Sequence, residues 1–151
     1  MKQMSLMALI GCSVLLAGCA SQSEVVFCPT ISAPEEGARS FVRSDNTKQI
    51  FDIRLNGVNA VCTQHNSGGT MVALSVGLKI KRSLAEGEAN DVIAVPMMSA
   101  IVDANQTVID NQEFGYRVGF DKGSDRKFPV AEIEQLVPAD ARLVISLRPA
   151  Y

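Results

Sequence analysis

The chain has 151 residues, with 14 Lys and Arg against 16 Asp and Glu, and carries a formal net charge of −2. At about 100–200 residues per domain, this length corresponds to one domain. Hydrophobic residues make up 47% of the chain, which excludes a disordered protein. The slight negative charge excludes the broad basic surface of a nucleic-acid-binding protein, so we expect no nucleic acid among the partners.

The N-terminal segment has the features of a bacterial lipoprotein signal peptide. Lys2 is its only ionised side chain, and the apolar run from Met4 to Leu16 suits a signal sequence but is too short to span a bilayer. The run ends in Leu16-Ala17-Gly18-Cys19, which resembles the lipobox of bacterial lipoproteins at every position. This resemblance implies cleavage before Cys19 and acylation of Cys19 by fatty acids such as palmitate. An ordinary secretory signal with a chance cysteine is the alternative.

Three parts of the chain follow from this interpretation. We predict a signal peptide at residues 1–18, a lipidated tether at 19–24 and a β-sandwich domain at 25–151. In the lipoproteins that the segment resembles, a residue other than Asp after the cysteine directs the protein to the outer membrane, and Ala20 fits that rule. The expected location is therefore the bacterial outer membrane, with a lipid anchor at Cys19 and the body in the periplasm.

Two cysteines remain for pairing once the signal peptide has been removed and Cys19 is lipidated. They are Cys28 and Cys62, and the compartment beyond the inner membrane is oxidising, so we predict a disulfide between them. Closing a loop of about 35 residues stabilises a fold by roughly 3–4 kcal/mol in the chain-entropy account. Two buried free thiols are the alternative. A zinc site would need further Cys or His ligands at suitable spacing, so we expect no metal.

Downstream of the tether, apolar and polar residues alternate with the period of two that is typical of β-strands. The clearest predicted strands are Gln49 to Gln64, Met71 to Lys81, Glu113 to Phe120 and Arg142 to Arg148. Gly57 interrupts the first of them and predicts a β-bulge or bend.

Turn residues and shorter apolar runs fill the intervals between these strands. His65 to Gly69 is the strongest turn signal, and Asp103 to Gln106 predicts a hairpin turn. Val92 to Val102 predicts another strand, in which Pro96 requires an edge or bulge position. Residues 128–137 fit either a helix or a strand, and we favour a strand because the neighbouring segments are strands.

About seven short strands at this spacing predict an all-β fold, an antiparallel immunoglobulin-like β-sandwich. The chain has no Trp, which argues against a true antibody-type domain, because there a core Trp packs against the disulfide. The predicted core consists of the apolar faces of the clearest strands, namely Phe51, Ile53, Leu55, Val72, Leu74, Val76, Leu78, Phe114, Tyr116, Val118, Leu143, Ile145 and Leu147.

The sequence contains no common catalytic motif. GxSxG, HExxH, CxxC and GxGxxG are all absent, and His65 is the only histidine. Asp121 and Asp125 have too few neighbouring oxygen ligands for a calcium loop, and paired carboxylates at Glu132 and Glu134 are weak evidence for acid–base chemistry. We therefore expect neither enzymatic activity nor a cofactor.

Five residues form the candidate contact surface. Lys79, Lys81 and Arg82 make a basic cluster at a predicted strand end. This cluster either protects a solvated strand edge from pairing or attracts an anionic lipid or cell-wall polymer. Asn66 and Ser67 lie in the strongest turn, and loops held on a rigid sandwich commonly carry recognition.

The order of these features resembles a group of small alphaproteobacterial envelope lipoproteins of unassigned function. The shared features are the lipobox, a Cys-Pro pair, a second Cys after an alternating strand, a basic pair at the end of the next strand, a hairpin and a final apolar strand. Here they are Cys19, Cys28-Pro29, Cys62, Lys81-Arg82, Asp103 to Gln106 and Leu143 to Leu147. Where that group often has Gly-Pro after the basic residue, this chain has Ser83-Leu84. The resemblance implies no catalytic residues.

The sequence therefore predicts a non-enzymatic binding or envelope-assembly module. Its expected partners are the membrane, through Cys19, and another envelope protein or a cell-wall polymer. One alternative is an inhibitor of an envelope-directed enzyme such as lysozyme, which would insert the loop from Asn66 to Thr70 into the enzyme's cleft. A small-ligand carrier is a further alternative.

Overall fold

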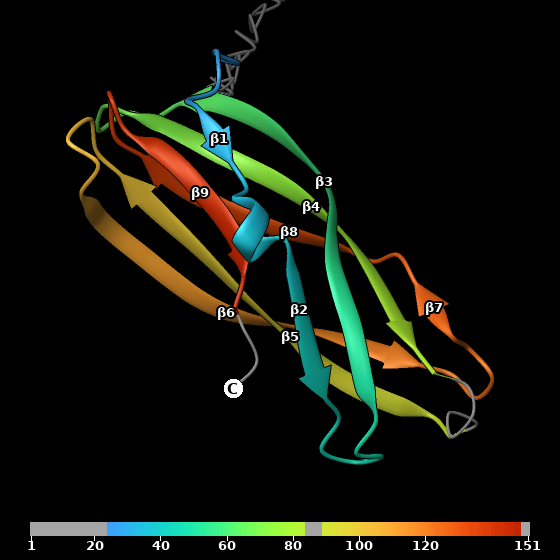
Figure 1. Ribbon diagram of the computed structural model, residues 1–151. Helices are drawn as coiled ribbons and strands as arrows, with labels where there is room; N and C mark the ends of the chain where they lie inside the picture. Colours follow the sequence, from blue (N-terminus) through green and yellow to red (C-terminus); the bar gives the residue numbers. More distant parts are fainter. Residues whose placement is uncertain (1–23, 84–88, 149–151) are drawn as a thin grey trace, which may run out of the picture.

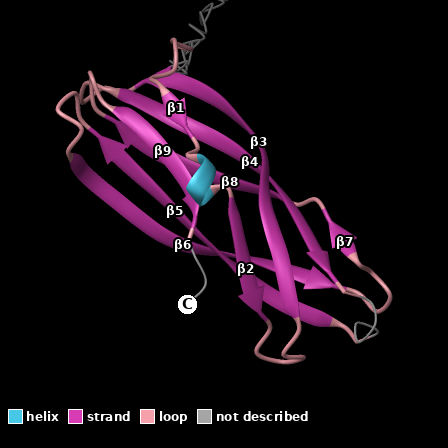
Figure 2. Ribbon diagram, viewed as in Figure 1, coloured by secondary structure: helices cyan, strands magenta, loops and turns pink. Residues whose placement is uncertain are grey.

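The structure, a computed structural model, describes residues 24–83 and 89–148. These residues form two β-sheets packed face to face (Figures 1 and 2). The predicted signal peptide, and the tether apart from Glu24, lie outside the described residues. The elements are β1 (Ile31–Ser32), the short 3-10 helix η1 (Glu35–Gly37), β2 (Arg39–Arg43), β3 (Ile50–Gln64), β4 (Thr70–Arg82), β5 (Asp91–Val102), β6 (Val108–Phe120), β7 (Arg126–Lys127), β8 (Val130–Val137) and β9 (Arg142–Leu147).

The predicted all-β sandwich is confirmed, but its strand order differs from that of an immunoglobulin domain. The four-stranded sheet has the order β1-β9-β5-β6, and the five-stranded sheet has β2-β3-β4, with β7 and β8 both pairing with β4. In immunoglobulin domains the last two strands are neighbours in one sheet. Here β8 pairs with β4 and β9 pairs with β5, so the last two strands lie in opposite sheets.

The core between the sheets is built from the predicted strand faces. The residues predicted for it are buried, except Leu55, Phe114 and Tyr116, which are partly buried and pack against it. One face of β5, which the predicted core does not include, completes the core. Its buried members include Ile93, Val95, Met97 and Ile101.

The predicted bulge in β3 is confirmed. The pairing of β3 with β4 shifts register between Leu55 and Val58. Gly57 within this interval has a φ of 105°, a conformation that favours glycine. On β4, a Cβ atom at Gly77 would lie 2.8 Å from the carbonyl oxygen of Asn56, so the close approach of the two strands requires glycine there as well.

Residues 128–137 and the segment around Pro96 also contain strands, as predicted. Residues 128–137 contain β8, as the favoured interpretation predicted. Pro96 lies in β5 just beyond the last strand pair between Met97 and Leu147. The carbonyl oxygen of Pro96 accepts a hydrogen bond from the N–H of Arg148 at 2.9 Å, so its nitrogen faces the side where β9 has ended. Proline cannot donate the reciprocal bond to Arg148, and the carbonyl oxygen of Arg148 instead accepts a hydrogen bond from Ser40 Oγ at 2.7 Å.

The sandwich has two distinct ends, which we call the N-terminal end and the distal end. At the N-terminal end, Val25 forms an isolated bridge with Thr63, close to the turn that joins β3 and β4. The distal end contains the turn between β2 and β3, at the opposite end of the molecule (Figure 1). At about 3.3 Å per residue, the 15 residues of β3 span roughly 45 Å between the two ends.

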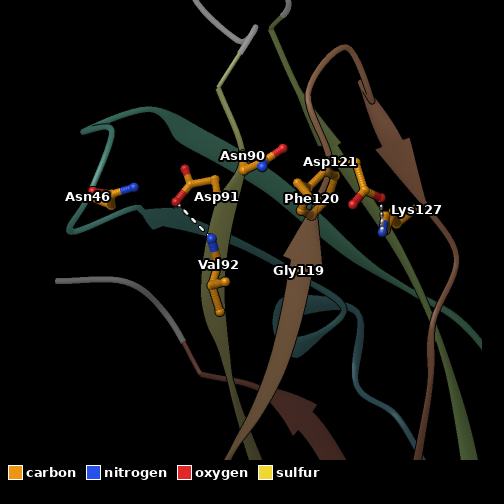
Figure 3. Close-up of a pocket in the computed structure, with 8 residues that line it drawn as sticks. All are labelled: Asn46, Asn90, Asp91, Val92, Gly119, Phe120, Asp121 and Lys127. Carbon is orange, nitrogen blue, oxygen red and sulfur yellow. Dashed lines mark hydrogen bonds and ion pairs between the residues drawn. The ribbon is translucent and has the colours of Figure 1, made fainter.

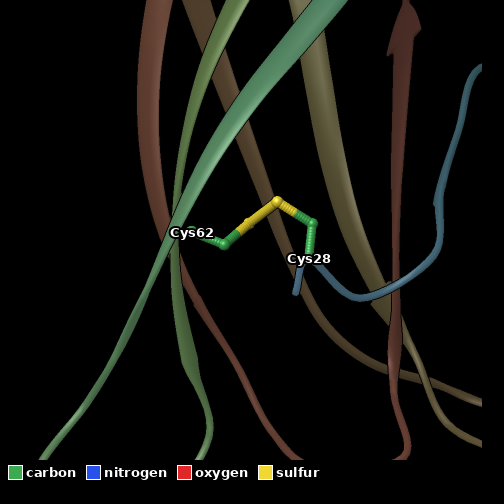
Figure 4. Close-up of a disulfide and its surroundings, with 2 residues drawn as sticks. All are labelled: Cys28 and Cys62. Carbon is green, nitrogen blue, oxygen red and sulfur yellow. A yellow bond between two sulfur atoms is a disulfide. The ribbon is translucent and has the colours of Figure 1, made fainter. Parts of the chain in front are cut away.

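The predicted disulfide between Cys28 and Cys62 is confirmed (Figure 4). Cys62 is buried in β3 of the five-stranded sheet. Cys28 precedes β1, which pairs with β9 in the four-stranded sheet. The disulfide therefore ties the chain that leads into one sheet to a central strand of the other.

The assignment of strand faces makes a prediction about stability. Leu74 lies in the core with 2% of its surface exposed. We expect Leu74→Ala to lower the free energy of unfolding by about 2–5 kcal/mol, because the substitution leaves a cavity. Urea denaturation measures this change. Val61→Ala, on the outer face of β3, is the control and should change the free energy by about 0.5 kcal/mol or less. Equal effects of the two substitutions would contradict the assigned faces.

Candidate functional site

Basic side chains gather on the outer face of the five-stranded sheet, in its distal half. In β2, Ser40 is buried and Val42 packs against the core, so the alternating residues face outward. They are Arg39, Phe41 and Arg43, all of which are exposed. The strand thus contributes two cations that flank one aromatic ring on a solvent-facing surface.

Strands β3, β4 and β7 continue this surface. The inward positions next to it, such as Phe51 and Ile80, are fully buried. We call the surface the basic face. It comprises Arg39, Arg43, Arg54, Lys79, Lys81 and Arg126, together with Asp52, Phe41 and Ile50.

Three pairs of like charges lie directly opposite each other across the strands of the basic face. Arg39 of β2 is opposite Arg54 of β3. Arg54 is in turn opposite Lys79 of β4, and Lys81 is opposite Arg126 of β7. Like charges at directly opposed positions destabilise a sheet. The face therefore concentrates more positive charge than folding alone favours.

Asp52 offsets part of this charge. Arg39 donates two hydrogen bonds to its carboxylate, from Nε to Oδ1 at 2.9 Å and from Nη2 to Oδ2 at 3.0 Å, and Arg54 Nη2 donates to Oδ2 at 3.1 Å. The hydrogen bonds from Arg39, and then those from Arg54, lower the pKa of Asp52. Among the residues that the structure describes, no carboxylate forms an ion pair with Arg43, Lys79 or Lys81.

Exposed apolar groups lie beside these cations. The guanidinium carbon of Arg39 lies 4.6 Å from the centroid of the Phe41 ring. Ile50 is exposed opposite Arg43, next to the pair formed by Phe41 and Asp52. Small molecules usually bind in concave pockets, whereas this surface is the outer side of a sheet. The basic face therefore suits an extended anionic ligand.

Arg82, which the sequence places in the predicted contact surface, is buried and does not belong to the basic face. Because it follows Lys81 directly, its side chain points to the opposite side of β4, where it is 6% exposed. Its guanidinium donates hydrogen bonds to three carbonyl oxygens, those of Ser124 at 2.7 Å, Asp121 at 2.8 Å and Ala89 at 2.9 Å. Arg82 therefore holds together separate chain segments at the distal end.

A depression of about 590 Å³ lies at the distal end (Figure 3). Its lining residues come from the β2–β3 turn, the start of β5 and the residue before it, the end of β6, the loop that follows and β7. They are Asn46, Asn90, Asp91, Val92, Gly119, Phe120, Asp121 and Lys127.

Asp91 is the buried carboxylate of this depression, with 3% of its surface exposed. It accepts hydrogen bonds from the hydroxyl of Ser44 at 2.7 Å, from the hydroxyl of Thr47 and from the N–H of Val92 at 2.8 Å. Burial alone would raise the pKa of Asp91, but these hydrogen bonds and the nearby charge of Arg82 outweigh burial and lower it. Asp91 therefore fastens the β2–β3 turn to the start of β5.

Asn66 and Ser67 lie far from Lys79 and Lys81, the lysines of the predicted contact surface. Both are exposed in the turn that precedes β4, where Ser67 Oγ is 2.7 Å from His65 Nδ1. Lys79 and Lys81 lie toward the other end of β4, roughly 30–40 Å away at 3.3 Å per residue. The five residues of the predicted contact surface therefore occupy different places and do not form one surface.

The other acidic residues considered for chemistry are exposed. Asp121 and Asp125 pair with neighbouring basic side chains, and Glu132 and Glu134 share the outer face of β8. Within residues 24–83 and 89–148, no three His, Cys, Asp or Glu side chains are placed to hold a metal ion. No helix in these ranges is long and apolar enough to cross a membrane.

Two cations of the basic face, Lys79 and Lys81, belong to the contact surface predicted from the sequence. The other four do not, and they are Arg39, Arg43, Arg54 and Arg126. The alternation of Arg39, Phe41 and Arg43 is visible in the sequence, but the strand neighbours that join it to Lys79 are not. Comparisons of the chain with models of protein families, with curated proteins and with solved structures found no match. The assignment of the basic face therefore depends on its geometry and charge.

The hydrogen bonds of Asp91 predict a pH dependence of stability. Because the pKa of Asp91 is lowered in the folded state, its carboxylate stabilises the fold above the unfolded pKa of about 3.9, and this contribution is lost as the pH falls through the folded pKa. Asp91→Asn should therefore be less stable than the wild type at pH 7, and the difference should shrink below about pH 4. Denaturant unfolding across this pH range measures the difference, and a constant difference would contradict the role of the charged carboxylate.

Proposed function

We propose that this protein is an outer-membrane lipoprotein, anchored through Cys19 with its β-sandwich in the periplasm, and that it works by binding rather than by catalysis. The lipobox-like sequence that ends at Cys19 supports the anchor. A disulfide between Cys28 and Cys62 is consistent with an oxidising compartment. The proposed contact surface is the basic face.

The like-charged pairs across the strands are the main support for the basic face as the contact surface. Charged residues on a strand often protect an open sheet edge, but Lys81 lies between Asp52 of β3 and Arg126 of β7, inside the sheet. Edge protection therefore does not explain the charge at this position. Local arrangements that reduce stability are expected mainly at functional sites. Binding of an anionic partner would relieve the repulsion between these cations.

The position of the basic face favours a cell-wall polymer as the partner. Arg54 and Lys79 lie in the distal half of the five-stranded sheet, roughly 30 Å along β3 from the bridge at Thr63. Since the proposed anchor enters at the N-terminal end, the basic face would lie away from the anchoring bilayer. An extended anionic polymer matches both this position and the shape of the surface.

The inhibitor alternative receives less support from the turn that precedes β4. This turn is closed by backbone hydrogen bonds from the N–H of Gly68 to the carbonyl of His65 at 3.1 Å and from the N–H of His65 to the carbonyl of Gly69 at 3.2 Å. A tight turn of this kind is poorly suited to reach into the cleft of an enzyme. It also lies at the end of the sandwich that the predicted tether joins.

Charge reversal within the basic face tests the proposal. We expect the wild-type lipidated protein to co-sediment with purified cell-wall sacculi, and this binding to weaken as salt rises. Lys79→Glu combined with Lys81→Glu should reduce the affinity about tenfold or more, because two attractive charges become repulsive. Sedimentation of the protein with sacculi over a range of concentrations measures the affinity.

A second double reversal provides the matched control. Lys48 and Arg117 are exposed, and Lys48 lies in the β2–β3 turn while Arg117 faces outward from the four-stranded sheet. Lys48→Glu combined with Arg117→Glu makes the same change in net charge outside the basic face. Equal loss of binding in both double variants would contradict a localised contact surface. Failure of the wild-type protein to bind sacculi would contradict the proposed partner.

A further inference from the structure

An exposed apolar patch lies at the N-terminal end of the sandwich, far from the basic face. Its members are Val25, Phe27 and Val61, which are 71%, 100% and 60% exposed. Val25 bridges to Thr63 on β3, and Val26 packs against the core. Because neighbouring residues in an extended chain point to opposite sides, Val25 and Phe27 face outward on the same side as Val61. We call these three residues the apolar patch.

The residues directly before and after Phe27 are both attached to β3, and they hold Phe27 in its exposed position. The N–H of Val26 donates a hydrogen bond to the carbonyl oxygen of Cys62 at 2.9 Å. Cys28, directly after Phe27, is joined to Cys62 by the disulfide. These two attachments to one strand prevent the segment from turning over. The exposure of the aromatic ring is therefore built into the fold.

The chain length between Cys19 and the apolar patch limits what can cover it. Five residues separate Cys19 from Val25, so the two residues can lie at most about 20 Å apart. If the acyl chains of Cys19 lie in the bilayer, the patch remains within that distance of the lipid head groups. A tether this short holds the patch near the membrane at an effective concentration in the millimolar range, so weak attraction is sufficient for contact.

We propose that the bilayer which holds the acyl chains of Cys19 also covers the apolar patch, with Phe27 inserted at the membrane interface. This inference rests on the proposed lipid anchor. Apolar side chains of an anchored domain gain by leaving water, and aromatic rings are favoured at the interface. Val61 and the basic face lie on the same outer side of the five-stranded sheet, roughly 20–25 Å apart along β3. Contact confined to the apolar patch therefore tilts the distal half of the sheet away from the membrane.

The absence of Trp from the chain allows a direct test by fluorescence. Phe27→Trp places a single fluorophore in the apolar patch, and Phe41→Trp places the same fluorophore on the basic face as the matched control. Each variant is expressed from the whole sequence, purified in its lipidated form and reconstituted into vesicles of phosphatidylethanolamine and phosphatidylglycerol, with or without brominated acyl chains. We expect a blue-shifted emission for Phe27→Trp, and quenching by brominated lipid at least threefold greater than for Phe41→Trp.

Flotation of the same vesicles reports whether the protein is attached to the membrane at all. Flotation without quenching of Phe27→Trp would overturn membrane docking and leave the proposed anchor intact. Equal quenching of both fluorophores would also overturn the proposal, because the domain would then lie along the membrane. Loss of flotation would refute the anchor, and with it the inference that rests on it.

Discussion

The antiparallel pairing of β3 with β4 is the constraint on which the rest of the structure depends. It fixes the outward direction of Lys79 and Lys81 and, because side chains alternate, the inward direction of Arg82. The same pair of strands holds Cys62 at the N-terminal end, where the disulfide fastens the first segment of the chain. One ladder of hydrogen bonds thus positions the basic face, the buried guanidinium behind it and the attachment of the N-terminus.

Buried polar contacts at the distal end offset the charge repulsion within the basic face. Repulsion between Lys81 and Arg126 acts to separate β4 from β7, which has only two residues. Arg82 opposes this separation, because it binds the carbonyl oxygens of Asp121 and Ser124 in the loop that leads into β7. A short strand that would be weak alone is therefore held in place. The structure separates a cationic surface from the polar contacts that stabilise it.

The sequence predicted local features well and pairing partners poorly. The alternation within Met71 to Lys81 identifies the core face of β4, because a period of two depends only on nearby residues. The disulfide could likewise be predicted, because only two cysteines are left for pairing once Cys12 is removed with the signal peptide and Cys19 is lipidated. The strand order differs from the expected immunoglobulin type because alternation does not reveal which sheet a strand joins. For the same reason, the sequence does not show that Arg39 and Arg126 lie beside the lysines. Arg82 was predicted to share a surface with Lys81, although alternation places the two side chains on opposite faces.

The proposed contact between the basic face and the cell wall is tested most directly by lysine acetylation of intact envelopes. Lys79 and Lys81 lie on the basic face, whereas Lys48 is exposed in the β2–β3 turn outside it. We expect acetylation of Lys79 and Lys81 to be severalfold slower in intact envelopes than in detergent-extracted protein, with the rate at Lys48 unchanged. Equal rates at all three lysines in the two preparations would contradict the account.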